Sequence, residues 1–219
     1  MRIVSVLEDQ KIEKRISITP DIAKKYLSLG FKVSLNENYG NHLGIGDDKF
    51  KELGVQILKD EKELINSADI IIQLGLLSDV NLSLLKENQT LIGALNPYNN
   101  RERIENLLKK NINFFSLELL PRITRAQSMD ILSSQANLAG YKAVIESFAS
   151  FKKAIPMMMT AAGTIPAAKV LVVGAGVAGL QAIATAKRMG AIVFATDVRV
   201  ASKEQVESLG GKFLSVEGV

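Results

Sequence analysis

Residues 169–187 read Lys169-Val-Leu-Val-Val-Gly-Ala-Gly-Val-Ala-Gly-Leu-Gln-Ala-Ile-Ala-Thr-Ala-Lys187. A β-branched strand, a glycine turn and an amphipathic helix follow one another here, which is the pattern of the βα unit of a dinucleotide-binding fold. Gly174 permits a tight turn off the strand, Gly176 lets the backbone approach a pyrophosphate, and Gly179 lets the helix lie close to the sheet. The helix start would then face the anion.

A second strand is expected at residues 191–196, and it ends at Asp197. This is close to the roughly 20-residue offset at which an acidic side chain receives the ribose hydroxyls. An isolated glycine motif is often only a loop, so the prediction depends on strand, helix, second strand and acid together. An aspartate repels a 2′-phosphate and accepts from a free 2′-hydroxyl, which favours NAD(H) over NADP(H). Arg199 could meet a phosphate and keeps NADP(H) open as the alternative.

The composition of the 219-residue chain narrows the class of protein. Its hydrophobic content of 47% can fill a core, and the formal charge of +4 is spread in mixed-sign clusters, so nucleic acid is not implied. The absence of cysteine excludes disulfides, thiolate nucleophiles and cysteine metal sites. His42 is the one imidazole, and in a glycine-rich loop it is more often structural than catalytic.

The first half of the chain alternates between strand and helix patterns, which predicts a parallel sheet flanked by helices. The apolar runs lie at about residues 2–7, 31–35, 69–74 and 90–95, and the helical patterns at about 20–30, 60–66 and 101–110. Thr19 as N-cap and Pro20 as first residue predict one helix start, and Gly30 its end. We expect an α/β protein with two Rossmann-like sub-domains and a cleft between them: residues 1–124, and a nucleotide domain at 125–219.

The segment between these regions is polar at first and then helical. Its helix carries a predicted apolar stripe made of Ile131, Leu132, Leu138, Ala139, Val144 and Ile145. Met157, Met158 and Met159 are expected to fill gaps in a core or domain interface, because thioethers suit irregular cavities. The polar residues at 122–134 allow two interpretations. They could be a solvated linker, or Gln127, Asp130 and Ser133 could hold a carboxamide while Arg122 steadies Asp130.

Three segments together resemble the NAD(H)-binding alpha subunit of proton-translocating NAD(P) transhydrogenases, which are relatives of the alanine dehydrogenases. The segments are Pro121-Arg-Ile-Thr-Arg-Ala-Gln-Ser-Met-Asp-Ile-Leu-Ser-Ser-Gln-Ala-Asn-Leu-Ala-Gly-Tyr141, Met157-Met-Met-Thr-Ala-Ala-Gly-Thr164 and Gly174-Ala-Gly-Val-Ala-Gly-Leu-Gln-Ala-Ile-Ala-Thr-Ala-Lys-Arg188. The similarity continues through Thr196-Asp-Val-Arg199 and 203–213, and it is looser before residue 120.

The resemblance implies roles for individual residues. Arg122, Gln127, Ser128, Met129, Asp130 and Ser133 would meet the nicotinamide end of NAD(H). Val177, Asp197, Val198 and Arg199 would lie along the adenosine half, with Gly174, Gly176 and Gly179 under the pyrophosphate. In such enzymes hydride passes from NADH to NADP⁺ on a separate component, and a membrane component couples this transfer to proton movement. The resemblance also implies a homodimer, peripheral to the inner membrane through partner subunits.

Two alternatives remain. An alanine dehydrogenase is expected to carry a lysine near 72–74 and a histidine near 91–97, and this sequence has neither, although Arg15 could contact a carboxylate. The chain ends at Gly218-Val219, where we expect the third strand of the nucleotide sheet to begin, so the second domain is expected to be incomplete. A binding-only module is therefore the second alternative. No secretory signal or transmembrane helix is expected, and the predicted location is the cytoplasm.

Overall fold

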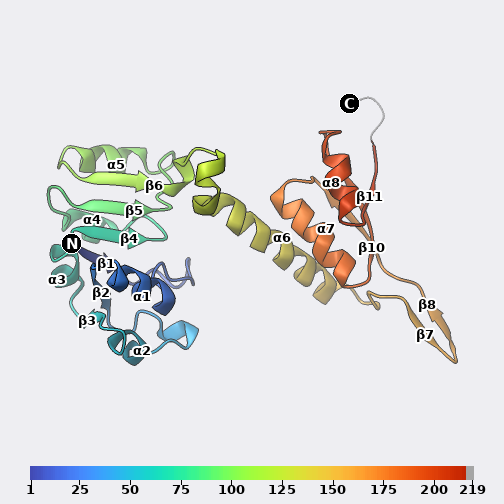
Figure 1. The fold of residues 1–219 in the computed structure, drawn as a ribbon, viewed down its shortest axis with the longest axis horizontal. Helices are drawn as coiled ribbons and strands as arrows, with labels where there is room; N and C mark the ends of the chain where they lie inside the picture. The colour runs from blue at the N-terminus through green and yellow to red at the C-terminus, as the bar shows by residue number, and fades with distance from the viewer. Residues whose placement is uncertain (216–219) are drawn as a thin grey trace. The chain divides into compact units, whose positions relative to one another are not determined.

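The computed structural model describes residues 1–215 of the chain. The chain divides into two compact units, Met1–Met129 and Asp130–Val219. Each unit has a parallel sheet of its own, with helices in the connections (Figure 1). The predicted α/β class with two parallel sheets is confirmed.

The first unit is built on a six-stranded parallel sheet in the order β3-β2-β1-β4-β5-β6. Its strands are β1 (Arg2–Ser5), β2 (Lys32–Asn36), β3 (Gln56–Leu58), β4 (Ile70–Gln73), β5 (Thr90–Gly93) and β6 (Asn113–Ser116). Each of the four predicted apolar runs contains one strand, whereas the short outer strands β3 and β6 were not predicted. The order reverses between β1 and β4, which makes this point a topological switch, the usual place for a crevice in such sheets.

Helices connect these strands. They are α1 (Pro20–Ser28), α2 (Asp47–Lys51), α3 (Glu61–Asn66), α4 (Asp79–Ser83) and α5 (Arg101–Leu108), with 3₁₀ turns at Asn41–Leu43, Leu117–Leu119 and Thr124–Met129. The Thr19 hydroxyl accepts a hydrogen bond from the Ile22 amide at 3.4 Å, and Pro20 is the first helical residue. Gly30 follows the helix with a φ of 85°, which only glycine adopts easily. The predicted start and end of α1 are confirmed.

The sheet of the first unit is buried on both faces. Neighbouring residues of β1 point to opposite sides, so Ile3 packs in one core cluster with Leu35 and Phe50, and Val4 packs in the other with Ile71 and Leu91. This burial on both faces explains why these strands read as continuous apolar runs rather than as alternating ones.

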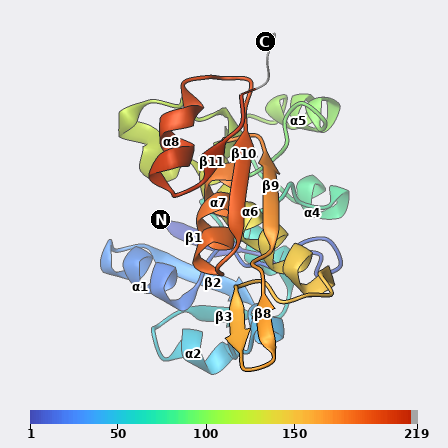
Figure 2. The same cartoon turned by 90° about the vertical axis from the view of Figure 1, so that its right-hand side faces the viewer.

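The second unit begins with a long helix and ends in a second parallel sheet. Its elements are α6 (Ile131–Ser150), β7 (Met158–Thr160), β8 (Gly163–Ile165), β9 (Lys169–Val173), α7 (Val177–Arg188), β10 (Ile192–Thr196), α8 (Ser202–Ser208) and β11 (Lys212–Phe213). Figure 2 shows β9, β10 and β11 side by side in the order β11-β10-β9. The third strand therefore lies at residues 212–213, earlier than expected, and Gly218-Val219 lie outside the described residues.

The face that α6 buries differs from the predicted stripe. Leu132 and Leu138 are 41% and 57% exposed, whereas Gly140 and Val144 are the buried residues of the helix. A Cβ at Gly140 would lie 2.0 Å from the carbonyl oxygen of Ala178 in α7, so the two helices approach closely at this glycine. The prediction was right at Val144 and wrong at Leu132 and Leu138, because it counted large apolar side chains, while the close contact with α7 is made by Gly140, which has none.

The three methionines do not fill a core. Met157, Met158 and Met159 are 62%, 48% and 74% exposed, and Met158 pairs with Ile165 in an antiparallel hairpin of β7 and β8. Among the described strands these two pair only with each other, and all six of their residues are exposed. Within residues 1–215, no helix combines the length and the apolar character that crossing a bilayer requires.

Candidate functional site

The glycine turn of the second unit joins β9 to α7 as the sequence predicted. Gly174 has a φ of 94°, and its amide donates a hydrogen bond to the Thr196 carbonyl at 2.8 Å. A Cβ at Gly179 would lie 1.8 Å from the Gly174 carbonyl oxygen, so this glycine lets the first turn of the helix sit against the loop itself. A Cβ at Gly176 would meet no atom of the described residues within 4 Å. Gly174 and Gly179 are therefore needed by the fold, whereas Gly176 faces open space.

The start of α7 has donors that the protein does not cap with a side chain. Gly176 is the N-cap, and within residues 1–215 no side-chain hydrogen bond closes this helix end. The first amides of a helix lack partners within the helix, and they carry the positive end of its dipole. Val177 opens the helix at this point. The turn therefore offers backbone donors to an anion such as a pyrophosphate.

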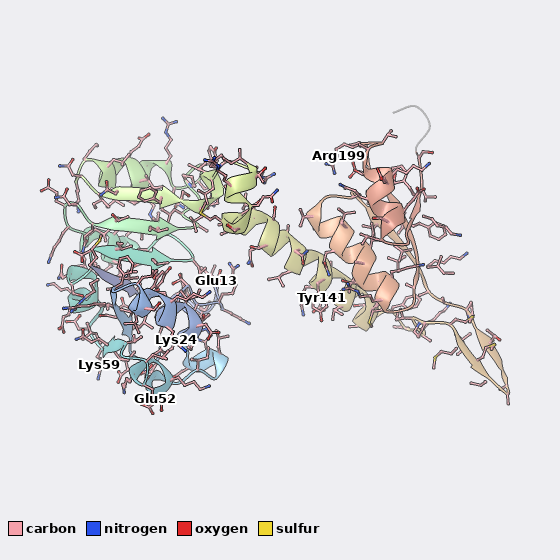
Figure 3. The ribbon with its side chains drawn as sticks, viewed as in Figure 1. Glu13, Lys24, Glu52, Lys59, Tyr141 and Arg199 are labelled. Atoms are coloured by element: carbon pink, nitrogen blue, oxygen red, sulfur yellow. The ribbon has the colours of Figure 1, made fainter. Side chains whose placement is uncertain are left out.

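Asp197 fastens the end of β10 to the glycine turn. Its Oδ2 accepts from the Ala175 amide at 2.6 Å, and its Oδ1 accepts from the Arg199 amide at 2.8 Å. The Arg199 guanidinium adds Nε to Oδ1 at 3.0 Å and Nη2 to Oδ2 at 3.1 Å. The Asp197 side chain is 6% exposed and that of Arg199 is 63% exposed. Arg199 is labelled in Figure 3. The guanidinium and the two amides hold the pKa of Asp197 well below its usual range, so it is a carboxylate at neutral pH.

A cavity of about 370 Å³ opens beside this carboxylate, at the carboxyl ends of the strands of the second sheet. Its lining is Val173, Gly174, Thr196, Asp197, Val198, Val200, Phe213 and Ser215. Sequence reasoning named Gly174, Asp197 and Val198 but missed the other five. Their common feature is that they end a strand or closely follow one, which is where ligands bind in open α/β sheets. The part of its lining that lies within residues 1–215 is mainly apolar with one carboxylate, and this suits a flat ring attached to a diol.

The polar segment at 122–134 splits between the two units. Arg122, Gln127, Ser128 and Met129 are exposed, the last three on the 3₁₀ turn Thr124–Met129. Asp130 begins the second unit as the N-cap of α6, where its Oδ1 accepts from the Ser133 amide at 2.9 Å and its Oδ2 from the Ser133 hydroxyl at 2.6 Å. The structure thus brings Asp130 and Ser133 together, and their shared hydrogen bonds start α6.

The first unit has a different cavity at its switch point. It measures about 660 Å³, and the carboxylates of Glu8, Asp9, Glu13 and Glu61 are part of its lining. Glu8 Oε1 accepts from the Leu74 amide at 2.6 Å and from Gln73 Nε2 at 3.2 Å, and burial raises the pKa of Glu8. Four acidic residues against one basic residue, Arg103, make this cavity unsuited to a phosphate.

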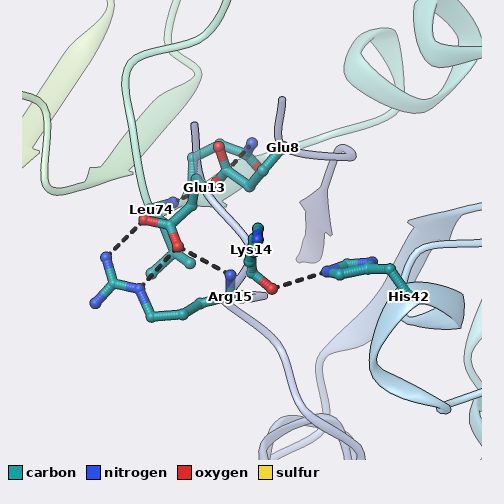
Figure 4. Close-up of polar contacts among 7 residues, drawn as sticks. Glu8, Glu13, Lys14, Arg15, His42 and Leu74 are labelled. Atoms are coloured by element: carbon teal, nitrogen blue, oxygen red, sulfur yellow. Dashed lines mark hydrogen bonds and ion pairs between the residues drawn. The ribbon is translucent and has the colours of Figure 1, made fainter. Parts of the chain in front are cut away.

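Polar side chains next to the residues of this acidic cavity are held by contacts within the first unit. Arg15 forms an ion pair with Glu13 at 2.6 Å, and the His42 ring lies 2.8 Å from the Lys14 carbonyl (Figure 4). Gln73 stands where an alanine dehydrogenase was expected to need lysine. Its side chain is 3% exposed and accepts from the Ser5 hydroxyl at 2.7 Å and the Val6 amide at 2.9 Å. It therefore links β1 to β4.

Comparisons with known proteins agree with this architecture. The models of the alanine dehydrogenase/PNT N-terminal and C-terminal domains match residues 6–139 and 143–218. The chain is 49% identical over 222 residues to a polypeptide of the NAD(P) transhydrogenase alpha subunit of Rhodospirillum rubrum, and 48% identical to its counterpart in Rickettsia prowazekii. These alignments cover 99% of this chain and 58% of each relative, so the chain spans less than two thirds of their length.

Solved structures show the same relationship. The structure of a transhydrogenase from Sinorhizobium meliloti superposes with a TM-score of 0.91 at 47% identity, covering 97% of this chain and 64% of that one. An L-alanine dehydrogenase superposes with a TM-score of 0.83 at 21% identity, covering 99% of this chain and 61% of that one, which shows a shared fold alone. By both of its domains, the chain belongs to the alanine dehydrogenase/PNT family.

Proposed function

We propose that this chain is the NAD(H)-binding part of a proton-translocating NAD(P) transhydrogenase, and that it presents NADH for direct hydride transfer to NADP⁺ on a partner component. The single observation that carries the proposal is the uncapped glycine turn at the start of α7, which lies beside a cavity that ends on Asp197. The names of the relatives that match 99% of the chain support the same reaction.

Each part of NAD(H) has a suitable partner in the second unit. Gly174, Gly176 and Gly179 would lie under the pyrophosphate, the uncapped amides at the start of α7 would face it, and the open space at Gly176 leaves room for it. The apolar wall that includes Val198 would receive the adenine. The Asp197 carboxylate, ionised at neutral pH, would accept from the ribose hydroxyls, which favours NAD(H) over NADP(H). Val177 and Arg199 flank these groups.

We assign the nicotinamide end to Arg122, Gln127, Ser128, Met129, Asp130 and Ser133. The exposed amide of Gln127 carries both a donor and an acceptor, which a carboxamide needs in a partner. α6 supports this assignment, because Asp130 caps the helix and Gly140, ten residues later, contacts α7 in its first turn. Within the second unit, the helix that Asp130 caps is therefore also the helix that packs against the start of α7.

The chemistry requires orientation more than acid or base groups. Bound nicotinamide supplies the hydride, and the two rings must approach to about 3–3.5 Å. The work of this chain is to fix the carboxamide rotamer and so aim the reacting carbon, which Gln127 and Asp130 would do. Transfer of a hydride between two rings needs no nucleophile, and the exposed polar groups of the turn at 124–129 suit such positioning.

The partners follow from the reaction. The chain would dock on NADP(H)-binding and membrane-spanning components and form a homodimer. It would then work at the cytoplasmic side of the inner membrane, held there by those components. The relatives are named as alpha subunits or as polypeptides of one, which supports an assembly of several components.

Isothermal titration of the 219-residue chain with NADH and NADPH tests the binding step. We expect NADH to bind more tightly. Stronger binding of NADPH, or no binding of either nucleotide, would overturn the proposal.

The transfer step is tested by combining the chain with the NADP(H)-binding and membrane components and following NADH-dependent reduction of an NADP⁺ analogue. Gln127→Leu should slow transfer much more than it weakens NADH binding. Gln205→Leu, an exposed glutamine of α8 outside the proposed site, is the matched control and should change neither. Equal losses of binding and transfer in Gln127→Leu would contradict the aiming role.

A further inference from the structure

The hydrogen-bond donors around Asp197 already use every acceptor site that the ribose hydroxyls would need. A carboxylate offers about four lone-pair sites. Two of those of Asp197 receive backbone amides, from Ala175 and Arg199, and the other two receive Nε and Nη2 of Arg199 at 3.0 and 3.1 Å. The amides belong to the glycine turn and to the backbone after β10, so they are part of the fold. The guanidinium is the movable part, because its side chain is 63% exposed.

We propose that the Arg199 side chain is a self-ligand of the adenosine pocket: it occupies the two Asp197 sites that the ribose hydroxyls need, and it must leave for NAD(H) to bind. This inference rests on the proposed function and deepens it. The backbone amide of Arg199 stays on Oδ1 in both states, so only the side chain exchanges. The exchange replaces two hydrogen bonds by two, and its cost is the loss of an ion pair whose guanidinium is exposed and whose carboxylate is buried.

The same contact determines how the pocket treats a 2′-phosphate. While Arg199 is paired with Asp197, the two charges cancel, so the carboxylate repels a phosphate less than a bare aspartate would. A guanidinium two residues from the carboxylate is also a good bidentate partner for phosphate. Asp197 therefore keeps Arg199 from serving as a receptor for NADP(H). Removal of Arg199 should move the preference toward NADH, and removal of the Asp197 charge should move it toward NADPH.

Two substitutions separate these effects in titrations with NADH and NADPH. Arg199→Gln should tighten NADH binding by about two- to fivefold, the range for an ion pair that water reaches on its guanidinium side. It should weaken NADPH binding, because the unmasked carboxylate repels the phosphate. Asp197→Asn should weaken NADH binding and tighten NADPH binding, because the guanidinium is released.

Matched controls remove the same charges elsewhere in the second unit. Arg188→Gln lies in the last turn of α7, and Glu204→Gln is exposed on α8. Both should leave the ratio of the NADH and NADPH dissociation constants as it is in the parent chain. A change of that ratio in the controls equal to that in the test variants would overturn the proposal, since net charge alone would then explain it.

A spectroscopic measurement keeps the inference distinct from the proposed function. In ¹⁵N spectra of the nucleotide-free chain, the Arg199 Nε–H resonance, identified by its loss in Arg199→Gln, should also shift in Asp197→Asn. Saturation with NADH should shift it in the parent chain. If NADH binds and this resonance does not move, or if Arg199→Gln weakens NADH binding, the self-ligand is wrong and the proposed function stands. If the parent chain binds no nucleotide, both fall.

Discussion

The two sheets begin alike and differ in what surrounds their first strands. In the first unit β1 pairs with β2 on one side and β4 on the other, and three of its four residues are buried. In the second unit β9 is paired with β10 alone among the described strands, and its residues alternate between exposed and half-buried. Leu171 and Val173 are 58% and 78% exposed. The same strand–helix–strand arrangement thus gives a buried first strand in one unit and a partly exposed first strand in the other.

The loops after these two strands differ in charge as well. β9 leads directly into glycines and the start of α7, where backbone amides collect. The segment after β1 carries Glu8 and Asp9 into its cavity, and α1 starts only at Pro20. The same position in the fold is therefore suited to an anion in the second unit and unsuited to one in the first. The position in a doubly wound sheet gives a crevice, and the loop sequence decides its ligand.

The largest expected effect on this difference between the units comes from replacing Gly179, the glycine that packs against the turn before α7. Gly179→Ala places a Cβ 1.8 Å from the Gly174 carbonyl, so the turn must shift. We expect a loss of about 2–4 kcal/mol of stability in the second unit and no measurable NADH binding. Gly93→Ala in β5, whose Cβ would lie 2.2 Å from the Gln73 carbonyl, is the counterpart in the first unit. Hydrogen exchange should assign each loss to its own unit, and a loss spread equally over both would contradict the division.

Gly176→Ala should separate binding from folding. Its Cβ meets no atom of the described residues within 4 Å, so thermal unfolding should not change. The methyl group would project where the pyrophosphate is proposed to approach, and NADH affinity should fall about 30-fold, or about 2 kcal/mol. Titration and calorimetry of the same preparation measure both. Unchanged NADH affinity would contradict the placement of the pyrophosphate at this glycine.

Tyr39→Phe should affect the first unit alone. The buried Tyr39 hydroxyl lies 2.8 Å from the Ser5 hydroxyl and accepts from the Ser17 and Ile18 amides at 3.1 and 3.2 Å. Its removal leaves these donors without an acceptor and should cost about 1–2 kcal/mol in the free energy of unfolding. NADH affinity should not change. Tyr98→Phe, at a side chain that is 82% exposed, is the control and should be neutral.

The smallest effect concerns the charge at the acidic cavity. Burial raises the pKa of Glu8, so the folded chain binds this proton more tightly than the unfolded chain does. Stability from this group is present below its ordinary pKa and is lost as the pH rises through the raised one. Glu8→Gln should therefore stabilise the first unit by less than about 1 kcal/mol at neutral pH, and the gain should vanish near pH 4. The free energy of unfolding of both chains, measured from pH 4 to pH 7, tests this prediction, and Glu52→Gln at an exposed position is the control. A Glu8→Gln variant less stable than the parent at neutral pH would contradict the raised pKa of Glu8.

The sequence by itself predicted what short-range rules control. The cap of α1 at Thr19, the strands at the apolar runs and the turn at Gly174 depend on neighbours within a few residues, and the structure has them all. The strands β3 and β6 were not predicted, because runs of three or four partly exposed residues carry too little hydrophobic periodicity. Proposed site residues could be named where a motif spaces them, as at Gly176 and Asp197.

Tertiary structure decided the features whose partners are distant in sequence. The carboxylate of Asp197 meets the amide of Ala175 22 residues away, and the cavity forms because the ends of three strands come together. α6 buries Gly140 rather than Leu138, because α6 and α7 can approach this closely only where a side chain is absent. Local sequence sets backbone conformation, whereas the saturation of a carboxylate or the face of a helix depends on which groups the fold brings within contact distance.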